Sequence, residues 1–372
     1  MPEQGKLSKI KYQSYPIDIA FRIEKSDGRY ELLIRISGYE SKKFSLQIRE
    51  HDLAQLSEEL HKKLSNMVRN NGDIDLTNED LYSLAKVGND AFIQIFGNID
   101  EALLEIIKEI IADGDKCLEI TSDEFLFPWE LIYPNDPHEK ETLSIKSFWG
   151  LKHIVNRVLC LKIPSPSLIN FCPRLGLLAY EGLPTVKSSE VPQFYDYQNQ
   201  SLINLIHLVF TTTEAEDLRT EFKTFWQNDF DLTHFACHAQ HDNAYGRSYI
   251  RINENFDVTI QELRTFGIKI KDKPLVIINA CEAGIMNSLS VSNFVNIFLN
   301  LGARGAIATE CTVPDQFAAD FSRKFYEYFL EQKRPLGESL LATRQYFLNE
   351  YNNPSGLLYS MYAPPNIQLA GD

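Results

Sequence analysis

Two short segments decide the fold of this chain: residues 231–241, DLTHFACHAQH, and residues 273–284, KPLVIINACEAG. Each is predicted to form an apolar β-strand that ends at a reactive side chain, His238 in the first and Cys281 in the second. If the strands are parallel neighbours, they lie about 4.8 Å apart and bring both side chains to one edge of a sheet. Ligands of open parallel sheets bind beyond the carboxyl ends of the strands. An imidazole and a thiol that meet there form a base and its nucleophile, which predicts a cysteine hydrolase.

A structural role is the alternative for both residues. A histidine or a buried cysteine at a strand end is usually structural when it occurs alone. Here the two residues end strands of the same predicted sheet, and small residues or turns follow both. A turn from strand to helix also leaves backbone N–H groups that can bind a developing oxyanion. The coincidence favours catalysis by His238 and Cys281.

Strand alternation separates the side chains of the first segment. It places His234, Ala236 and His238 on one face of the sheet and Phe235 and Cys237 on the other. The histidines and Cys237 have spacings that resemble those of zinc ligands. Because the thiol points away from the two imidazoles, these groups do not converge on one ion. We therefore predict neither a metal site nor a bound cofactor.

The composition limits the class of protein. The 372 residues suffice for two domains, and the net charge of −14 argues against nucleic acid or an anionic membrane as the main partner. No apolar run reaches the about 18 residues of a membrane span, and the first residues, MPEQGKLSKIKYQ, lack an apolar signal core. The six cysteines are scattered without a C-x-x-C pair, which is typical of reduced thiols. We therefore expect a cytoplasmic protein.

The pattern of elements changes at a linker, PSPS, at residues 164–167. Before it we predict strands at 17–24, 30–37, 43–48 and 116–121 and helices at 52–68, 80–96 and 101–111. Beyond it, strands at 174–180, 203–210, 231–238, 273–280, 303–309 and 357–361 alternate with helices near 213–226, 259–266, 291–301, 315–332 and 336–349. Such alternation predicts an α/β fold with a mostly parallel sheet and helices on both faces. We expect a smaller α+β lobe at 1–163, followed by an α/β lobe at 164–372.

Local motifs support several of these elements. Thr213 with Glu216 and Thr259 with Glu262 have the spacing of capping boxes at helix starts. Trp129 lies in the phrase FPWELIY near the predicted boundary between the lobes. We interpret this tryptophan as a packing element rather than a substrate contact.

Further motifs surround the two strands. Asn279-Ala280-Cys281 follows His238 by a 43-residue separation between base and nucleophile, similar to the about 50 residues of the caspase Q-A-C signature. The phrase P-W-E-L occupies 128–131, and G-A-R-G-A-I-A-T at 302–309 precedes V-P-D at 313–315. With these motifs the chain resembles the CHAT domains, caspase-like cysteine peptidases related to caspases and separase. The resemblance covers the second lobe well and rests mainly on P-W-E-L in the first.

The resemblance implies a caspase-like fold and a non-catalytic first lobe. It implies that Cys281 attacks the scissile carbonyl, that His238 serves as acid and base, and that the backbone N–H groups of Ala239 and Cys281 hold the oxyanion. Two positions depart from the family pattern. Ala239 replaces the usual glycine after the histidine but keeps its N–H. Glu282 follows the cysteine, with the glycine at Gly284 one position later than in caspases, and we expect the Glu282 carboxylate to face solvent.

Many CHAT relatives are fused to repeat domains or encoded beside effector genes, and several resemble parts of anti-phage systems. We therefore expect an endopeptidase that cleaves a protein substrate in a prokaryotic defence or cell-death pathway. Because no sensor repeats are visible in the sequence, an activating partner protein is expected. The alternative is a catalytically silent caspase-like adaptor that binds partners through its acidic surface. The oligomeric state is left open.

Three carboxylates follow the predicted strands that flank the dyad: Glu181, Glu310 and Asp315. In caspase-like folds the pocket for the residue before the cleaved bond lies at these strand ends, as the resemblance implies. A pocket with carboxylate walls would bind Arg or Lys and repel Asp. In the alternative, Asp315 caps a helix and the two glutamates are simply solvated.

Overall fold

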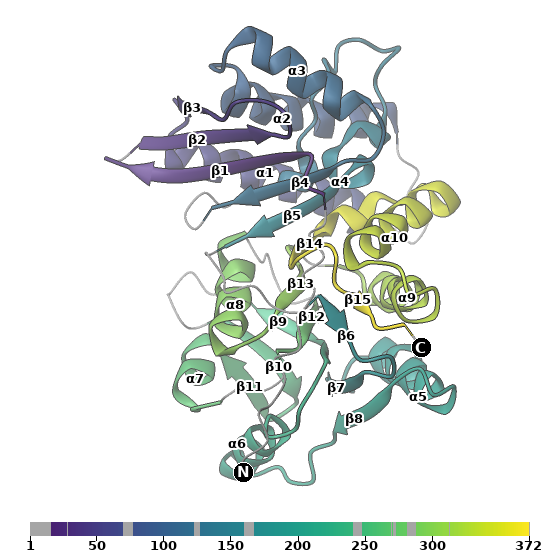
Figure 1. Ribbon diagram of the computed structural model, residues 1–372. Coiled ribbons are helices and arrows are strands. Elements are labelled where there is room, and N and C mark those ends of the chain that lie inside the picture. The colour runs from purple at the N-terminus through teal and green to yellow at the C-terminus, as the bar shows by residue number, and fades with distance from the viewer. Residues whose placement is uncertain are drawn as a thin grey trace, which may run out of the picture.

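One sheet runs through the whole molecule and joins both predicted lobes (Figure 1). The structure is a computed structural model that describes residues 16–27, 29–69, 77–122, 127–159, 167–240, 248–268, 270, 273–280, 288–311 and 313–371, with only the backbone at 288–293. Neighbouring strands across the sheet are β11 (Phe256–Thr259), β10 (Tyr249–Asn253), β9 (Leu232–Gln240), β12 (Leu275–Ala280), β13 (Gly305–Thr309), β14 (Tyr359–Tyr362), β5 (Ile154–Val158), β4 (Cys117–Thr121), β1 (Ile19–Ser26), β2 (Arg29–Ile36) and β3 (Lys42–Ser45).

Two further strands attach to β9. The first half of β9 pairs with β7 (Arg174–Ala179), which pairs in turn with β8 (Asn204–Leu208). These pairs are parallel, as are β9 with β12 and β12 with β13. The predicted class, α/β with a mostly parallel sheet, is confirmed. A separate small sheet pairs β6 (Leu168–Ile169) with β15 (Gln368–Leu369).

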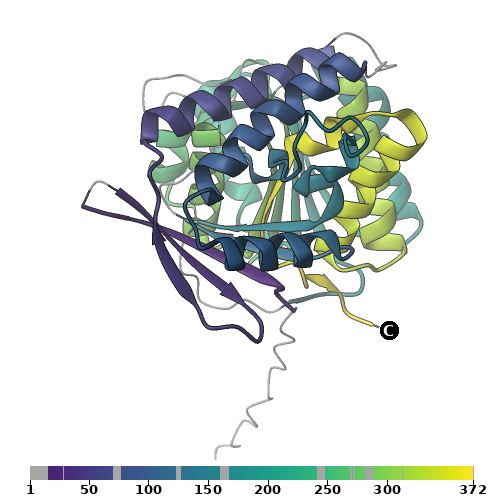
Figure 2. The same cartoon turned by 90° about the horizontal axis from the view of Figure 1, so that it is seen from above.

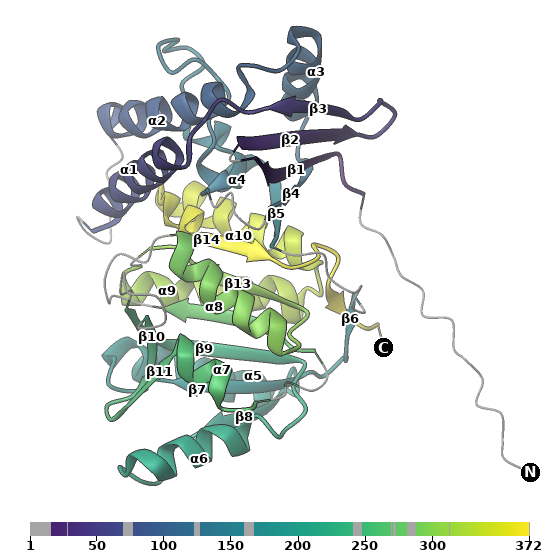
Figure 3. The same cartoon turned by 90° about the vertical axis from the view of Figure 1, so that its left-hand side faces the viewer.

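Helices cover both faces of the sheet (Figure 1). One face carries α6 (Ala215–Phe225), α7 (Ile260–Thr265) and α8 (Ser288–Leu301), and the other carries α5 (Val191–Asn199), α9 (Asp315–Tyr326) and α10 (Leu336–Tyr351). Over the first strands, α1 (Glu50–Arg69) and α2 (Asn78–Phe96) run side by side, with α3 (Glu101–Ala112) on the opposite side (Figures 2 and 3). In the described part of the chain, no helix is long and apolar enough to cross a membrane.

Shorter helical segments connect these elements. They are the α-helical turn α4 (Trp149–Lys152), the 3₁₀-helices η1 (Trp129–Leu131), η2 (Ile145–Ser147) and η5 (Pro354–Leu358), and the π-helices η3 (Val186–Glu190) and η4 (Glu327–Glu331). Trp129 is buried and its ring stacks on that of Trp149, with 6.3 Å between centroids. The interpretation of Trp129 as a packing element is confirmed.

The sequence patterns were wrong at several boundaries. The capping box of Thr259 and Glu262 is present, whereas α6 begins after Glu214 without a side-chain cap, so the box predicted at Thr213 does not form. Strand β9 continues two residues beyond its predicted end at His238, because β10 of the β10–β11 hairpin pairs with it there. The hairpin itself, β5 and α5 were not predicted. The linker residues 164–166 lie outside the described part of the chain.

The two predicted lobes meet at a seam between β5 and β14. Only Met361 and Asn156 pair across these two strands. A buried ion cluster lies at the same seam. The Arg157 guanidinium donates to the carboxylates of Glu130 and Glu310, one from each side of the seam. Since few backbone hydrogen bonds join β5 to β14, side chains contribute much of the connection, both through this ion cluster and through an apolar core that is continuous across the seam.

Replacing Arg157 with methionine should destabilise the protein strongly. The change leaves Glu130 and Glu310 buried without their shared cation, which should cost about 3–5 kcal/mol in free energy of unfolding. Urea denaturation measures this cost. Arg22 is a matched control, because its pair with Glu24 is exposed and Arg22→Met should cost less than about 1 kcal/mol. Similar losses in the two variants would show that the cluster does not hold the seam.

Candidate active site

The side chains of β9 alternate between two buried layers. Leu232 and Ala236 pack in the layer that contains residues of α5 and α9. Phe235 and Cys237 pack in the opposite layer with residues of α6 and α8. The predicted alternation along this strand is therefore confirmed.

The parallel register of β9 and β12 aligns the two predicted reactive positions. Ala280, the last residue of β12, lies opposite Cys237 of β9. His238 is the next residue of β9, and Cys281 is the next residue of the chain after Ala280. Cys281 lies outside the described residues, as do the positions of the predicted turn that follows it. The dyad therefore stays a prediction, and the register of the strands that lead to it supports the prediction.

His238 is half-buried at the end of the parallel part of the sheet. Its ring lies 5.5 Å from that of Tyr180, centroid to centroid, and Arg251 of β10 lies opposite it in the ladder. Ala239 is buried and lies opposite Ile250 in the same ladder. The residue after the base therefore continues the strand, beyond the strand end predicted at His238. The predicted role of its N–H as an oxyanion donor is not tested by this geometry.

Cys237, next to His238, cannot take the role of nucleophile. The thiol is fully buried, and burial followed by the nearby Glu190 carboxylate raises its pKa well above the ordinary value. Since the thiolate is the reactive form, this thiol is chemically inert at neutral pH. Cys117 is similar, with burial raising its pKa to about 12.

A buried polar network lies beneath the predicted dyad, and sequence patterns did not reveal it. His234 and Asn279 point from β9 and β12 to the same carboxylate, that of Glu190 at the end of η3. The His234 Nε2 to Glu190 Oε1 distance is 2.8 Å, and Asn279 Nδ2 donates to the same oxygen at 2.6 Å. His234 and Asn279 each make a further hydrogen bond through another polar atom of the side chain. The Tyr326 hydroxyl lies 3.1 Å from His234 Nδ1, and the Tyr359 hydroxyl donates to Asn279 Oδ1 at 2.7 Å.

The network fixes one residue on each of the two strands that lead to the predicted catalytic positions. His234 lies four residues before His238, on the same face of β9, and Asn279 lies two residues before Cys281. An imidazole protonated on Nε2 satisfies both of its contacts, with the Tyr326 hydroxyl donating to Nδ1. Because every member is buried, breaking one contact leaves a polar group unsatisfied. The network therefore holds β9, at His234, and β12, at Asn279, in a fixed relation.

The three carboxylates predicted for the substrate pocket have different surroundings. Glu310 is buried, and its oxygens accept from Arg157 and from the Tyr362 hydroxyl, with His61 Nε2 at 3.1 Å. Burial alone would raise the pKa of Glu310, but the charges of Arg157 and His61 lower it to about 2. The Glu310 carboxylate is paired within the ion cluster at the seam and does not face an open pocket.

The other two carboxylates lie outside the ion cluster. Glu181 is exposed after β7, with its Oε1 4.0 Å from Nε2 of His207. Asp315 is half-buried in the first turn of α9. The helix cap is Pro314, so the alternative in which Asp315 serves as the N-cap is wrong. These two residues remain candidates for a substrate pocket.

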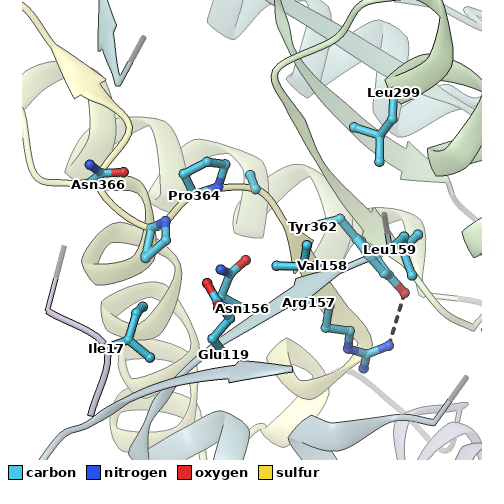
Figure 4. A pocket seen from close by; sticks show the side chains of 12 residues that line it. Ile17, Glu119, Asn156, Arg157, Val158, Leu159, Leu299, Tyr362, Pro364 and Asn366 are labelled. Atoms are coloured by element: carbon cyan, nitrogen blue, oxygen red, sulfur yellow. Dashed lines mark hydrogen bonds between the residues drawn. The ribbon is translucent and has the colours of Figure 1, made fainter. Parts of the chain in front are cut away.

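Among the described residues, neither a metal-ligand cluster nor the cavity at the seam involves the strands that lead to the predicted dyad. Among the described residues, no three His, Cys, Asp or Glu side chains gather as metal ligands would. A cavity of about 330 Å³ opens at the seam between β5 and the segment after β14 (Figure 4). Glu119 and Asn156 point into it, and burial raises the pKa of Glu119. Its lining includes no residue of β9 or β12, so it is a separate feature.

Comparisons with known proteins agree with this geometry. A family model for the CHAT domain matches residues 173–361, about half of the chain. A protein of Vitiosangium sp. (strain GDMCC 1.1324), named as a probable protease, is 26% identical over 247 residues. The match covers 63% of this chain and 32% of that relative, so this chain spans about a third of the relative's length.

The fold is similar to that of a solved separase. Separase from Saccharomyces cerevisiae, solved in complex with securin, superposes with a TM-score of 0.55 over 95% of this chain and 30% of the separase chain, at 11% identity. At this identity the likeness concerns the fold, which is caspase-like as predicted. From the matched residues and the fold together, the chain belongs to the CHAT domain family of caspase-like proteases.

Proposed function

We propose that this chain is a cysteine endopeptidase that cleaves a protein substrate, with Cys281 as nucleophile and His238 as general acid and base. One observation carries the proposal, namely the parallel register in which Ala280 lies opposite Cys237. Cys281 directly follows Ala280 and His238 directly follows Cys237, so this register supports neighbouring positions for the two reactive residues. Membership of the CHAT family adds the expectation that the reaction is hydrolysis of a peptide bond. The polar network beneath β9 and β12 supplies the rigidity that a dyad requires.

The chemistry follows from the two groups. His238 accepts the thiol proton, and the Cys281 sulfur forms a bond to the scissile carbonyl carbon. Collapse of the tetrahedral intermediate breaks the C–N bond, His238 returns the proton to the leaving amine, and a thioester remains. Water, deprotonated by His238, then attacks the thioester carbonyl and releases the acid product and the thiol. Backbone N–H groups of Cys281 and Ala239 are the proposed oxyanion donors.

Cys281→Ala and His238→Ala should each abolish peptide cleavage while the protein stays folded. The thiol supplies the new bond and the imidazole moves the proton, so neither step proceeds without its group. Cleavage of a fluorogenic peptide library, with circular dichroism to check folding, measures both effects. Cys237→Ala is the matched control, because this neighbouring thiol is buried and should leave cleavage unchanged. Loss of activity in Cys237→Ala with activity retained in Cys281→Ala would refute the assignment.

A catalytically silent adaptor is the second candidate, and one observation favours it. Ala239 continues β9 in extended strand opposite Ile250, without the backbone freedom that the usual glycine would give the residue after the histidine. A thiol-reactive probe separates the two functions. A catalytic Cys281 should react faster than a free thiol in solution, whereas the cysteine of an adaptor should not.

We also propose that the substrate residue before the cleaved bond is Arg or Lys. Glu181, exposed after β7, and Asp315, half-buried in the first turn of α9, support this preference, whereas Glu310 does not, because it is buried and paired with Arg157. Carboxylates at a pocket wall attract a cation and repel the aspartate that caspases select.

A panel of peptides that differ only at this position should show the highest kcat/KM for Arg or Lys. Asp315→Asn should then weaken cleavage of Arg peptides about tenfold and leave peptides with an apolar residue unchanged. Asp320→Asn, on the same helix, is the matched control and should change neither. A preference of the wild-type protein for Asp or for an apolar residue would overturn the idea.

Finally, we propose that a separate partner protein switches the peptidase on, in a prokaryotic defence or cell-death pathway. An unrestrained peptidase would damage the cell that makes it, and loops beside the base are where an activator can order a site. The purified chain should therefore turn over its natural substrate slowly and accelerate when the partner is added. High turnover without any partner would contradict this proposal.

A further inference from the structure

A second surface cavity lies on the face of the sheet that carries α5 and α9. Its volume is about 460 Å³. Both π-helices of the described chain form its walls: η3 contributes Ser188 and Ser189, and η4 contributes Glu327 and Glu331. Residues of α5 and α9 complete the lining. π-Helices are rare in proteins and frequently occur at functional sites.

The charge of the lining favours a cation. Its ionisable side chains include three carboxylates, on Asp196, Glu327 and Glu331, and one guanidinium, on Arg323. Glu327 pairs with Lys324 beside the cavity, whereas Glu331 forms no salt bridge with a described residue. Burial and the neighbouring Glu327 carboxylate raise the pKa of Glu331, and the charge of Lys324 opposes this rise, so a further cation beside Glu331 would stabilise its charged form.

A buried acceptor without a partner also lines the cavity. Gln193 is 6% exposed, and its Nε2 donates to the Tyr197 hydroxyl at 3.3 Å. Tyr197 in turn donates to the Arg323 carbonyl oxygen at 3.3 Å, which fixes the orientation of the amide. Oε1 of Gln193 is then left without any hydrogen-bond partner. A buried amide oxygen in this state is stabilised by a ligand that brings an N–H donor.

The two π-helices that line this cavity are connected to the buried polar network around His234. Glu190 is the last residue of η3, directly after Ser189, and accepts from His234 Nε2. Tyr326 directly precedes η4, and its hydroxyl contacts the other nitrogen of the same imidazole. A shift of either π-helix therefore acts on His234, about 13 Å along β9 from His238.

We propose that this cavity binds an Arg or Lys side chain of a partner protein, and that η3 and η4 relay its occupancy through Glu190 and Tyr326 to His234. The cation would lie between Glu327 and Glu331, and a rotation of the Gln193 side chain would bring Oε1, which is enclosed in the free protein, to its N–H groups. The rim residues are exposed, so a side chain presented on a protein surface can enter. The proposed binding site does not depend on the peptidase assignment. The proposed role of the relay in controlling activity rests on that assignment.

The binding site is tested on the full chain with butylguanidinium as probe and butylurea, its neutral analogue, as control. Titration followed by isothermal calorimetry should show that butylguanidinium binds and butylurea does not. Glu331→Gln should weaken the binding about tenfold, because a charge-assisted contact is lost. Glu105→Gln removes an equal charge from the exposed surface of α3 and should have no effect. Equal binding of the two probes, or no change in Glu331→Gln, would overturn the site.

The relay is tested in the Cys281→Ala variant, so that its outcome does not depend on peptidase activity. The ring signals of His234 and His238 in NMR spectra should both move as butylguanidinium saturates the cavity. Tyr326→Phe keeps the aromatic ring but removes the hydroxyl contact, so it should leave the probe affinity unchanged and reduce the shift at His238. An unmoved His238 signal at saturation would overturn the relay. Failure of peptide cleavage in the wild-type protein would refute the proposed function and leave both results intact.

Discussion

The ion cluster around Arg157 is the polar interaction that joins the two halves of the continuous sheet, within an apolar core that spans the same seam. β5 and β14 share a single residue pair, so backbone hydrogen bonding alone would leave the first strands loosely attached. The guanidinium joins Glu130, in the P-W-E-L phrase, to Glu310, which follows β13. Arg344 of α10 reaches Glu130 from the opposite direction at 3.4 Å. P-W-E-L therefore has a physical role in this chain: Trp129 packs the first part, and the following glutamate attaches it to the CHAT region.

A second buried network performs a similar task beneath the predicted dyad. Glu190 joins β9 to β12 through His234 and Asn279, and Tyr359 anchors Asn279 from β14. Three neighbouring parts of the sheet are thus fixed to one another by side chains as well as by their ladders. The two networks are adjacent, because Glu310 follows the strand that lies between β12 and β14. The strands that lead to the predicted dyad are consequently connected by hydrogen bonds to the helices on the face of the sheet that carries α5 and α9.

Sequence patterns predicted the elements with strong periodicity and the parallel pairing of β9 with β12. They also separated Cys237 from His234 correctly, since alternation along a strand is a local property. Long-range features were missed for physical reasons. The contact between Glu190 and His234 joins residues 44 positions apart, and no local pattern indicates that a glutamate before a helix turns inward. The β10–β11 hairpin was missed because its strands are short. Glu310 was expected at a pocket because it follows a predicted strand, and no local pattern indicates its pairing with Arg157, which lies 153 positions away in the other lobe.

The position of β14 has a consequence for how the protein folds during synthesis. This strand, the last of the large sheet along the chain, lies between β13 and β5 and contributes the tyrosine that holds Asn279. A ribosome must therefore release residues up to Tyr362 before the sheet can close. Until then the earlier strands have an open edge, which is a site for aggregation or for chaperone binding. The same delay keeps the strand ends from being locked together on a nascent chain, so assembly of the site is one of the last events of folding.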